Sequence, residues 1–328
     1  MTVIVTTSPG FGKHGSVPDI IAQKGWTLIR CTDPDLHDGG VSRYIGDADY
    51  LVVGLTPVTA DTLVGASRLK AVLKHGVGTD NIDISACNAR GLPVCNTPAA
   101  NADAVAELAL GLMFSLARFI PQGHGSVISG GWNRRVGSQL GNKVLGIVGL
   151  GNIGKRLAVM ARGLGMRVVA TDPFADMDFA RAHAITVVDL PALLGQSDYV
   201  SLHVFGGPDT AALINAATLA QMKPGARLIN LARGEVVDLD AVAAALQSGQ
   251  LGGVALDAFV SEPPDVSHPV FSHPNAVFTP HSGADTQEAV ENVGLMVLQD
   301  IATLEQGHLP DRCLNANALH ARDSRTGA

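Results

Sequence analysis

The sequence predicts an α/β protein with two domains, each built on a parallel sheet. Its 328 residues are about twice the ~150 residues that serve as a prior for one domain. Short β-branched runs alternate with longer, alanine-rich segments along most of the chain, as they do in strand–helix–strand units. Glycine supplies 37 residues, about 11% against the ~7% of average usage. We therefore ask which of these glycines belong to a functional site.

The first hundred residues hold enough elements for one small α/β domain. Helical segments are expected near Ile20–Lys24 and Ser85–Ala89. Short apolar and β-branched runs predict five strands, at Val3–Thr6, Thr27–Arg30, Tyr50–Val53, Ala71–Leu73 and Pro93–Cys95.

A long apolar segment follows, from Asn101 to Phe119. Asn101 or Asp103 is a suitable N-cap, and Pro121 is expected to end the helix. Alanine, leucine and methionine occupy nearly every face, so we expect this helix to be buried against other domains or another subunit. A glycine-rich stretch, Gly123–Gly131, follows it.

A second series of strands and helices begins at Val144 and predicts a doubly wound sheet. Its strands are expected at Val144–Val148, Arg167–Thr171, Ile185–Val187, Tyr199–His203, Ala226–Asn230, Gly253–Ala255 and Ala276–Thr279. The segment Thr286–Gln306 is helical and comes after this series, so we expect it to return to the first domain. The predicted domains are therefore 1–99 with 286–328, and 100–285.

The charge balance argues against nucleic acid and anionic membranes as partners. Acidic residues number 30 against 23 basic ones, a formal charge of −7, and like charges form no long runs. The most apolar stretch, Leu108–Ala117, is well short of the ~18 residues of a membrane span. The four cysteines form no CxxC pair and no export signal is visible, so we expect a reducing, cytoplasmic location.

The dinucleotide-binding pattern GxGxxG occurs twice, beginning at Gly10 and at Gly149. Each copy has an aspartate 23 residues after its first glycine, Asp33 and Asp172, so the acidic partner does not distinguish them. The immediate context does. In a working fingerprint the strand enters the first glycine directly, and the third glycine lies in the first helical turn.

The second copy meets both demands, because the run ending in Val148 leads into Gly149, Gly151 and Gly154. In the first copy, the three residues Thr7 to Pro9 separate the strand from the pattern, and Pro18 prevents a helix from starting at Gly12. We therefore expect the second copy to hold a pyrophosphate. The first is expected to be a glycine-rich loop, and whether it touches substrate is left open.

Asp172 predicts the cofactor. A carboxylate at the end of the second strand accepts hydrogen bonds from ribose hydroxyls and repels a 2′-phosphate. Pro173 and Phe174, which follow it, supply no arginine to bind such a phosphate. NAD is favoured over NADP.

Three residues near the ends of late strands are candidates for catalysis: Arg233, Glu262 and His281. Hydride transfer between NAD and a 2-hydroxy acid needs an arginine for the carboxylate, a histidine for the hydroxyl proton, and a carboxylate to orient the histidine. Taken singly, each has a plainer interpretation, a surface ion pair or a structural histidine. The spacing of His268, His273 and His281 matches no zinc pattern, so no metal is expected.

Taken together, the motifs resemble the D-isomer-specific 2-hydroxyacid dehydrogenase family, and within it the catalytic part of the D-3-phosphoglycerate dehydrogenases. The matching segments follow one order along the chain: KHGVGTDNID at Lys74, CNTP at Cys95, VAEL at Val105, GLGNIG at Gly149, NLARG at Asn230, ALDAF at Ala255, EPP at Glu262, PHSG at Pro280 and LNANAL at Leu314.

The resemblance implies a split, flavodoxin-like substrate-binding domain, a Rossmann NAD-binding domain with the active site in a cleft, and a homodimer through the helix 101–119 region. Arg233 would bind the substrate carboxylate, and Glu262 would pair with His281, the acid/base. Val77 and Gly78 would also hold the carboxylate, and Lys74 the far end of the substrate. Cofactor contacts are implied for Thr97, Gly149, Gly151, Asn152, Ile153, Gly154, Asp172, Val204, Leu231, Ala232, Asp257, Ser282 and Gly283.

Some features depart from the family pattern. Lys74 stands where the phosphoglycerate enzymes have an arginine, so it lacks the bidentate fork for phosphate. The loop from Phe205 and the region around Trp132 also differ. The chain stops soon after Leu319, so feedback through an appended regulatory domain is not expected. Phosphoglycerate dehydrogenase proper, a reductase of other 2-oxo acids and an NAD-sensing corepressor remain alternatives.

Overall fold

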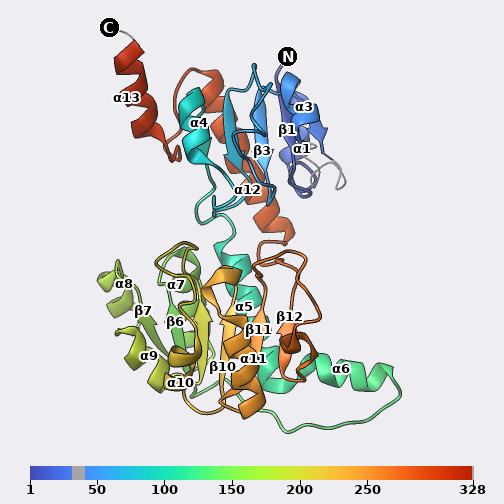
Figure 1. Cartoon of the computed structure of the whole chain (residues 1–328), viewed down its shortest axis with the longest axis vertical. Helices are drawn as coiled ribbons and strands as arrows, with labels where there is room; N and C mark the ends of the chain where they lie inside the picture. The colour runs from blue at the N-terminus through green and yellow to red at the C-terminus, as the bar shows by residue number, and fades with distance from the viewer. Residues whose placement is uncertain (32–40, 327–328) are drawn as a thin grey trace. The chain divides into compact units, whose positions relative to one another are not determined.

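The computed structural model describes residues 1–31 and 41–326, with side chains as far as Arg322. The chain divides into two compact units, shown in Figure 1. Unit 1 comprises Met1–Asn101 and Ala284–Ala328, and unit 2 comprises Ala102–Gly283. These limits differ by two residues from the boundaries expected from the sequence. Asp33, the acidic partner of the first glycine pattern, lies outside the described residues.

Unit 1 contains a five-stranded parallel sheet in the order β2-β1-β3-β4-β5. All five predicted strands are confirmed. Their bounds are β1 Val3–Thr6, β2 Thr27–Arg30, β3 Tyr50–Val53, β4 Ala71–Lys74 and β5 Val94–Cys95.

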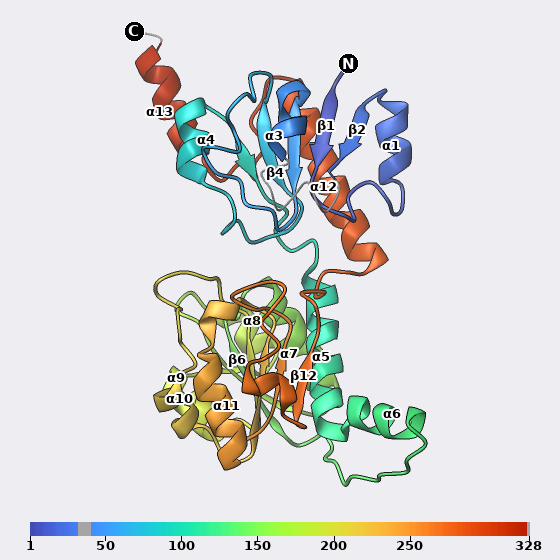
Figure 2. The same cartoon turned by 45° about the vertical axis from the view of Figure 1, so that its right-hand side comes forward.

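Helices cover both faces of this sheet (Figure 2). They are α1 Val17–Gln23, α3 Val41–Tyr44, the 3-10 turn η1 Ile45–Asp47, α4 Ile84–Arg90 and α12 Gln287–Glu305, with α13 Ala316–Thr326 at the end of the chain. Ile4 and Tyr50 pack with α1 and α12, whereas Val5 and Leu51 pack with α3, η1 and α4. The alternation follows from the two-residue period of a strand. The expected return of the C-terminal helix to the first domain is confirmed.

Unit 2 contains a seven-stranded parallel sheet in the order β12-β11-β10-β9-β6-β7-β8. The strands are β6 Val144–Val148, β7 Arg167–Thr171, β8 Thr186–Val187, β9 Tyr199–Leu202, β10 Ala226–Asn230, β11 Leu251–Leu256 and β12 Ala276–Phe278. The order reverses between β6 and β9, which is the switch point at which open α/β sheets bind their ligands.

The helices of unit 2 also form two layers. Their bounds are α5 Ala102–Arg118, α6 Ile120–Ile128, α7 Asn152–Gly163, α8 Met177–Ala182, α9 Leu190–Gln196, α10 Ala216–Gln221 and α11 Leu239–Ser248, with the short turns η2 Gly234–Val236 and η3 Pro269–Ser272. In one core, α5 and α7 pack against Leu145 and Ile147 of β6. In the other, α9, α10 and α11 pack against Val144 and Val148 on the opposite face of the same strand. Both faces of the sheet are therefore buried, which explains its continuous apolar strands.

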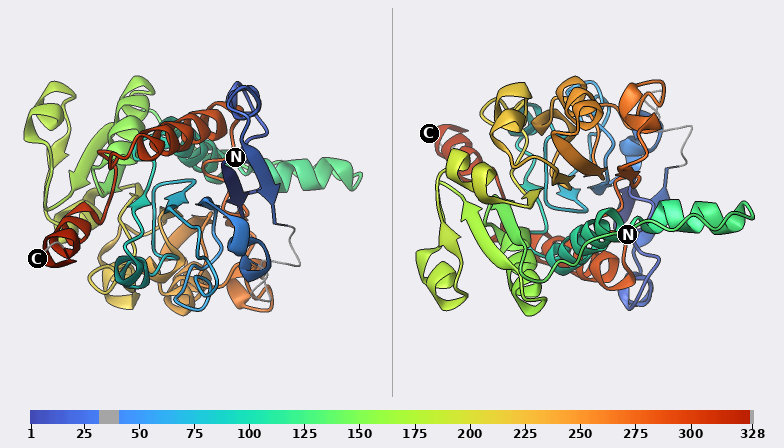
Figure 3. Two further views of the ribbon diagram at one scale, coloured as in Figure 1. Left: turned by 90° about the horizontal axis from the view of Figure 1, so that it is seen from above. Right: turned by 90° about the horizontal axis from the view of Figure 1, so that it is seen from below.

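The expectation that Pro121 ends the long helix was wrong. Phe119 adopts a left-handed conformation (φ 54°) and ends α5, and Pro121 then lies in the first turn of a new helix, α6. Proline is favoured in a first turn because its fixed φ is helical and its missing N–H has no partner to lose there. The glycines at 123 and 125 are therefore helical. Figures 1 and 3 show α6 extending away from the sheet of unit 2.

The burial expected for α5 is only partly met. Nine of its seventeen residues are buried, but Asp103, Glu107, Phe114 and Arg118 lie along an exposed stripe. Within the described part of the chain, no single helix is long and apolar enough to cross a membrane. Only α5 and α6 taken together reach that length and composition, and they meet at a bend of 64°.

Candidate active site

The second glycine pattern forms a tight loop between β6 and α7. Gly149 has φ +95°, and a Cβ added there would lie 2.6 Å from the carbonyl oxygen of His203. A Cβ on Gly154 would lie 2.1 Å from the carbonyl oxygen of Gly149. Both positions therefore require close backbone approach that only glycine allows without a shift.

The N-terminus of α7 fits a pyrophosphate. Gly151 is the N-cap and supplies no side-chain hydrogen bond to the helix, and Asn152 and Ile153 begin the first turn. A Cβ added to Gly151 would meet no atom within 4 Å, so the fold itself does not require glycine there. Free N–H groups and the helix dipole favour an anion at such a terminus. The glycine at 151 leaves the space at the start of α7 open to a ligand.

Asp172 lies at the end of β7, beside this loop. One carboxylate oxygen accepts the N–H of Leu150 (2.8 Å) and the other accepts the N–H of Phe174 (2.7 Å). The two bonds fix the carboxylate next to the glycine loop and leave each oxygen able to accept another hydrogen bond. This placement fits ribose hydroxyls, as the sequence predicted.

Glu262 and His281 form a close pair in unit 2. Nδ1 of His281 lies 2.8 and 2.9 Å from the two carboxylate oxygens of Glu262. One of these oxygens also accepts the N–H of Phe259 at 3.0 Å, which anchors the carboxylate to the end of β11. The predicted partnership of these two residues, 19 positions apart, is thus present in the structure.

The environment of Glu262 favours its ionised form. Partial burial opposes the charge, but the hydrogen bonds from His281 and from the Phe259 N–H, with the nearby charges of His281 and Arg233, lower the pKa of Glu262 below its usual 4.5. Glu262 is therefore a carboxylate at neutral pH. A carboxylate in this position orients the imidazole and stabilises its protonated form.

Arg233 follows β10 in a turn shaped by Asn230. The fully buried side chain of Asn230 accepts the N–H of Ala232 (2.9 Å) and donates to the carbonyl of Arg233 (2.8 Å). Nη1 of Arg233 donates to the carbonyl of Ala232 at 2.8 Å. Asn230 thus fixes the backbone from which the guanidinium extends.

Asp257 holds the segment that carries His281. Its buried carboxylate accepts the hydroxyl of Thr279 (2.6 Å), the N–H of Ser282 (2.9 Å) and the N–H of Gly283 (3.0 Å). His281 has a positive φ of 51°, a conformation that non-glycine residues adopt only when their surroundings hold them there. The structure therefore gives Asp257 a positioning role, besides the cofactor contact that the resemblance implies.

Other predicted cofactor residues lie at the same edge of the sheet. Val204 follows β9, Leu231 and Ala232 follow β10, and Ser282 and Gly283 follow β12. All of these strands are parallel, so their carboxyl ends share one edge with the glycine loop.

The predicted substrate loop of unit 1 follows β4. The side chain of Asn96 donates to the carbonyl of Val77 (2.7 Å), and the hydroxyl of Thr97 donates to the carbonyl of Gly76 (2.9 Å). Among the described residues, the N–H groups of Val77 and Gly78 form no hydrogen bond. They fit the predicted role of carboxylate donors. The bonds of Thr97 show that it shapes this loop, and its contact with the cofactor stays a prediction.

Lys74 is buried within unit 1. Its ammonium donates to the carbonyl of Gly54 (2.6 Å) and to the side-chain oxygen of Asn81 (2.7 Å). These contacts hold together the loops after β3 and β4. They argue against an ammonium extended toward the far end of a substrate.

The first glycine pattern has a different surrounding. Here α1 begins only at Val17, and both the N–H and the hydroxyl of Ser16 donate to the carboxylate of Glu291 at 2.9 Å. A side chain of the same unit thus provides an anion beside the start of this helix. The prediction that this copy is not the phosphate loop agrees with this arrangement.

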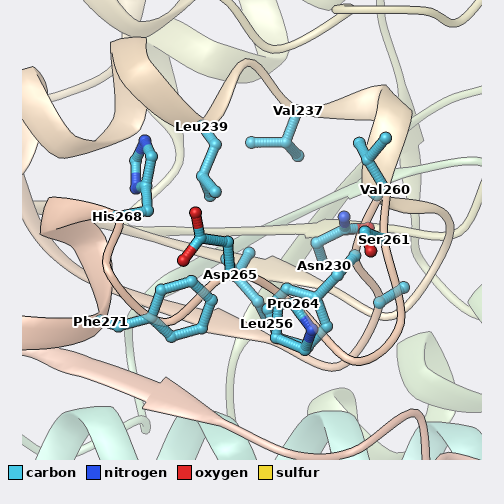
Figure 4. A pocket seen from close by; sticks show the side chains of 13 residues that line it. Asn230, Val237, Leu239, Leu256, Val260, Ser261, Pro264, Asp265, His268 and Phe271 are labelled. Carbon is cyan, nitrogen blue, oxygen red and sulfur yellow. The ribbon is translucent and has the colours of Figure 1, made fainter.

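A cavity of about 170 Å³ in unit 2 lies beside the loop of Glu262. Figure 4 shows Val237, Leu239 and Phe271 at its wall, with His268 and Asp265. None of the predicted catalytic or cofactor residues lines it. His268 pairs with Asp240 at 3.0 Å, and the described residues contain no group of three or more potential metal-ligating side chains.

Sequence reasoning missed Asn230 and Thr279 as positioning residues. Asn230 begins the NLARG motif, three residues before Arg233, and Thr279 immediately precedes the PHSG motif, two residues before His281. Their polarity at positions facing a buried turn is a signal that could have identified them.

Comparison with known proteins identifies the fold and the cofactor. Residues 110–283 match the family model of the D-isomer specific 2-hydroxyacid dehydrogenase, NAD binding domain. The chain belongs to this family. Its unit 2 is an NAD-binding domain of the family, and the resemblance stated from the motifs is confirmed.

Two D-3-phosphoglycerate dehydrogenases illustrate the likeness in sequence. That of Synechocystis sp. is 42% identical over 259 residues, which are 78% of this chain and 46% of that protein. That of Rattus norvegicus is 38% identical over 309 residues, 89% of this chain and 58% of that protein. The chain spans about half the length of these curated relatives.

Solved structures of family members match along nearly the whole chain. The apo D-lactate dehydrogenase of Escherichia coli has a TM-score of 0.86 at 27% identity, covering 96% of this chain and all of that one. The D-lactate dehydrogenase of Aquifex aeolicus, complexed with NAD and lactic acid, has a TM-score of 0.80 at 27% identity, covering 93% and 96%.

Proposed function

We propose that this member of the family is an NAD-dependent oxidoreductase that interconverts a D-2-hydroxy acid and its 2-oxo acid. The observation that carries the proposal is the Glu262–His281 pair, held by Asp257 and Phe259 in the NAD-binding domain that also contains Arg233. Bound NAD would supply the hydride acceptor, and NADH the donor, for C2 of the acid.

Arg233 and the loop of unit 1 are proposed to bind the acid. A guanidinium holds a carboxylate through two parallel hydrogen bonds, which fixes the orientation of the reacting carbon. The N–H groups of Val77 and Gly78 are further donors of the kind that a carboxylate accepts.

His281 is proposed to move the hydroxyl proton. Its Nδ1 is the nitrogen next to Glu262, which leaves Nε2 as the nitrogen that exchanges a proton with the substrate oxygen. In the reducing direction His281 donates this proton, and in the oxidising direction it accepts it. Glu262, ionised at neutral pH, keeps the ring oriented.

The cofactor would be bound at the edge of the sheet in unit 2. Gly149, Gly151 and Gly154 permit close approach of the pyrophosphate to α7, and Asp172 accepts the ribose hydroxyls. We propose NAD rather than NADP, because the carboxylate of Asp172 repels a 2′-phosphate.

The substrate is tested by a panel of 2-oxo acids with NADH, compared by kcat/KM: 3-phosphohydroxypyruvate, hydroxypyruvate, glyoxylate and sugar-derived acids. Phosphoglycerate dehydrogenase proper is the second candidate, supported by the 42% identity to such an enzyme. The Lys74 ammonium is buried and hydrogen-bonded within unit 1, and it lacks the bidentate fork of an arginine, which favours an acid without phosphate. A preference of more than tenfold for the phosphorylated acid would reverse this order.

The same panel distinguishes an enzyme from an NAD-sensing protein. Oxidation of NADH with at least one acid, and formation of the D rather than the L product, supports the proposal. Tight NADH binding without turnover of any acid, together with NAD-dependent capture of a protein partner, would contradict it.

We further propose a homodimer through the helix 101–119 region and a cytoplasmic location. Apolar side chains at Phe114, Ile120, Val127, Ile128 and Trp132 are exposed along α5, α6 and the following segment, which supports a partner on this surface. Sedimentation should give the mass of two chains for the wild type and a weaker dimer for Phe114→Asp. A monomeric wild type would contradict the dimer.

Cell fractionation tests the proposed location, and the protein is expected in the cytoplasmic fraction.

A further inference from the structure

Two cysteines of unit 1 lie opposite each other across a short antiparallel pairing. Cys95 ends β5, and Cys313 belongs to the C-terminal segment that pairs with it. The N–H of Leu314 donates to the carbonyl of Val94 at 2.8 Å, so the hydrogen bond lies beside the cysteine pair rather than within it. In such non-hydrogen-bonded pairs the Cα atoms are ~4.5 Å apart, inside the ~4.4–6.8 Å range that a disulfide spans.

Both residues are free thiols, and they differ in burial. Cys95 is fully buried and Cys313 is half-buried, so Cys313 is the sulfur that a solute can reach. The proximity of the two sulfurs lowers the pKa of Cys313 and, with burial, raises that of Cys95, while the Cys313 thiol lies 3.3 Å from the side-chain oxygen of Asn315. N–H groups of Val94 and Asn315 support the lowering, while burial and the charge of Asp300 oppose it. Asp300 is itself paired with Arg312 at 2.7 Å.

The other two cysteines provide a contrast. Cys87 is buried in α4, and burial raises its pKa to about 11. Cys31 lies at the end of β2, and the structure brings neither of the two across from a second cysteine. Only the pairing of Cys95 with Cys313 offers both an accessible thiol and a resolving thiol.

We propose that Cys95 and Cys313 form a thiol–disulfide exchange site that closes to an intramolecular disulfide with a low-molecular-weight disulfide such as oxidised glutathione. The thiolate of Cys313 attacks one glutathione sulfur, the glutathione S–S bond breaks, and one glutathione thiolate leaves and takes up a proton. The Cys95 thiol then loses its proton and attacks the Cys313 sulfur, which releases the second glutathione. Two protein thiols are oxidised and one glutathione disulfide is reduced.

The disulfide would join the two parts of the discontinuous unit 1. Cys95 belongs to the N-terminal part and Cys313 to the C-terminal part, and all of unit 2 lies between them in the sequence. Closing so long a loop restricts the unfolded chain and stabilises the folded one. Asn96 and Thr97, which follow Cys95, form hydrogen bonds with the carbonyls of Val77 and Gly76. The proposed disulfide would therefore lie next to residues that hold the predicted substrate loop.

Peptide mapping of the native protein tests the site. After incubation with oxidised glutathione, non-reducing digestion should yield one cross-linked peptide pair containing Cys95 and Cys313, lost again with dithiothreitol. The rate should fall as the pH is lowered, because the Cys313 thiolate becomes protonated. Tm should rise by several degrees on oxidation.

Three variants sharpen the result. Cys95→Ser should stop at a mixed disulfide of glutathione with Cys313, and Cys313→Ser should give neither product. Cys87→Ser is the matched control and should cross-link like the wild type. Glutathione on Cys31 or Cys87 alone, a disulfide between two chains, or no modification of the folded wild type would overturn the proposal.

Discussion

The two copies of GxGxxG in this chain share their glycine spacing and the position of an aspartate, yet they form different structures. In unit 2, β6 leads straight into Gly149, and α7 begins at Asn152 with no side-chain hydrogen bond capping its N-terminus. In unit 1, α1 starts after the whole pattern, and Ser16 before it is bonded to the carboxylate of Glu291. One loop is prepared for an external anion, and the other already has an internal one.

The difference lies in the spacing between elements. A phosphate site needs the helix to begin inside the pattern, so that its first N–H groups face the ligand. The residues between β1 and Gly10, and Pro18 after the pattern, move the start of α1 beyond it. The second glycine of each copy shows the contrast: Gly12 is left-handed, with a would-be Cβ 2.8 Å from Leu28, whereas Gly151 has open space.

Substituting the second glycine of each copy gives the largest expected contrast. Gly151→Val should leave Tm nearly unchanged but weaken NADH binding on the order of 100-fold, about 2.7 kcal/mol, because its side chain occupies the approach of the pyrophosphate. Gly12→Ala should lower Tm and leave the Kd for NADH within about twofold. Fluorescence titration and thermal unfolding of both variants check this. If both or neither lost NADH affinity, the distinction between the copies would fail.

The two aspartates at equal spacing give the next effect. Asp172→Ala should reduce the preference for NADH over NADPH about tenfold, or about 1.4 kcal/mol, because the carboxylate that accepts the ribose hydroxyls is lost. Asp33→Ala is the matched control and should retain the wild-type preference. The ratio of kcat/KM for the two cofactors is the measurement, and an unchanged ratio in Asp172→Ala would show that another residue selects NAD.

The internal anion of unit 1 gives the smallest effect. The N–H and hydroxyl of Ser16 lower the pKa of Glu291 below its usual 4.5. A carboxylate with a lowered folded-state pKa contributes its full stabilisation above its unfolded value, and loses it as the pH falls through the folded value. Glu291→Gln should therefore lower Tm by a few degrees at pH 7 and flatten the fall of Tm below about pH 4.5. An altered Kd for NADH in this variant would place the first copy in the cofactor site after all.

Much of this contrast follows from local sequence. The β-branched runs predict every strand of both sheets, because the strands are short and nearly all of them contain buried apolar residues; β2 and β8 are only partly buried. The second glycine pattern and Asp172 are identifiable because their spacing is fixed by one strand and one helix. The catalytic candidates could be identified only from the order of several longer motifs along the chain. These candidates are Arg233, Glu262 and His281.

The remaining features depend on contacts that no local pattern contains. Glu291 reaches Ser16 across 275 positions, so the internal anion could not be predicted from the first pattern. The start of α6 at Ile120 was missed because proline both ends helices and begins them, and the left-handed Phe119 decides between the two. The role of Asp257 in holding the His281 segment required the turn after β12.

In the mechanism that we propose, unit 2 binds the cofactor and its Glu262–His281 pair moves the substrate proton. The most direct test measures kcat for reduction of the best 2-oxo acid together with the Kd for NADH in His281→Asn. Asparagine tolerates the left-handed backbone at this position. We expect a loss of about 10²–10⁴-fold in kcat, with a Kd for NADH within about twofold of the wild type. A kcat near the wild-type value would contradict it.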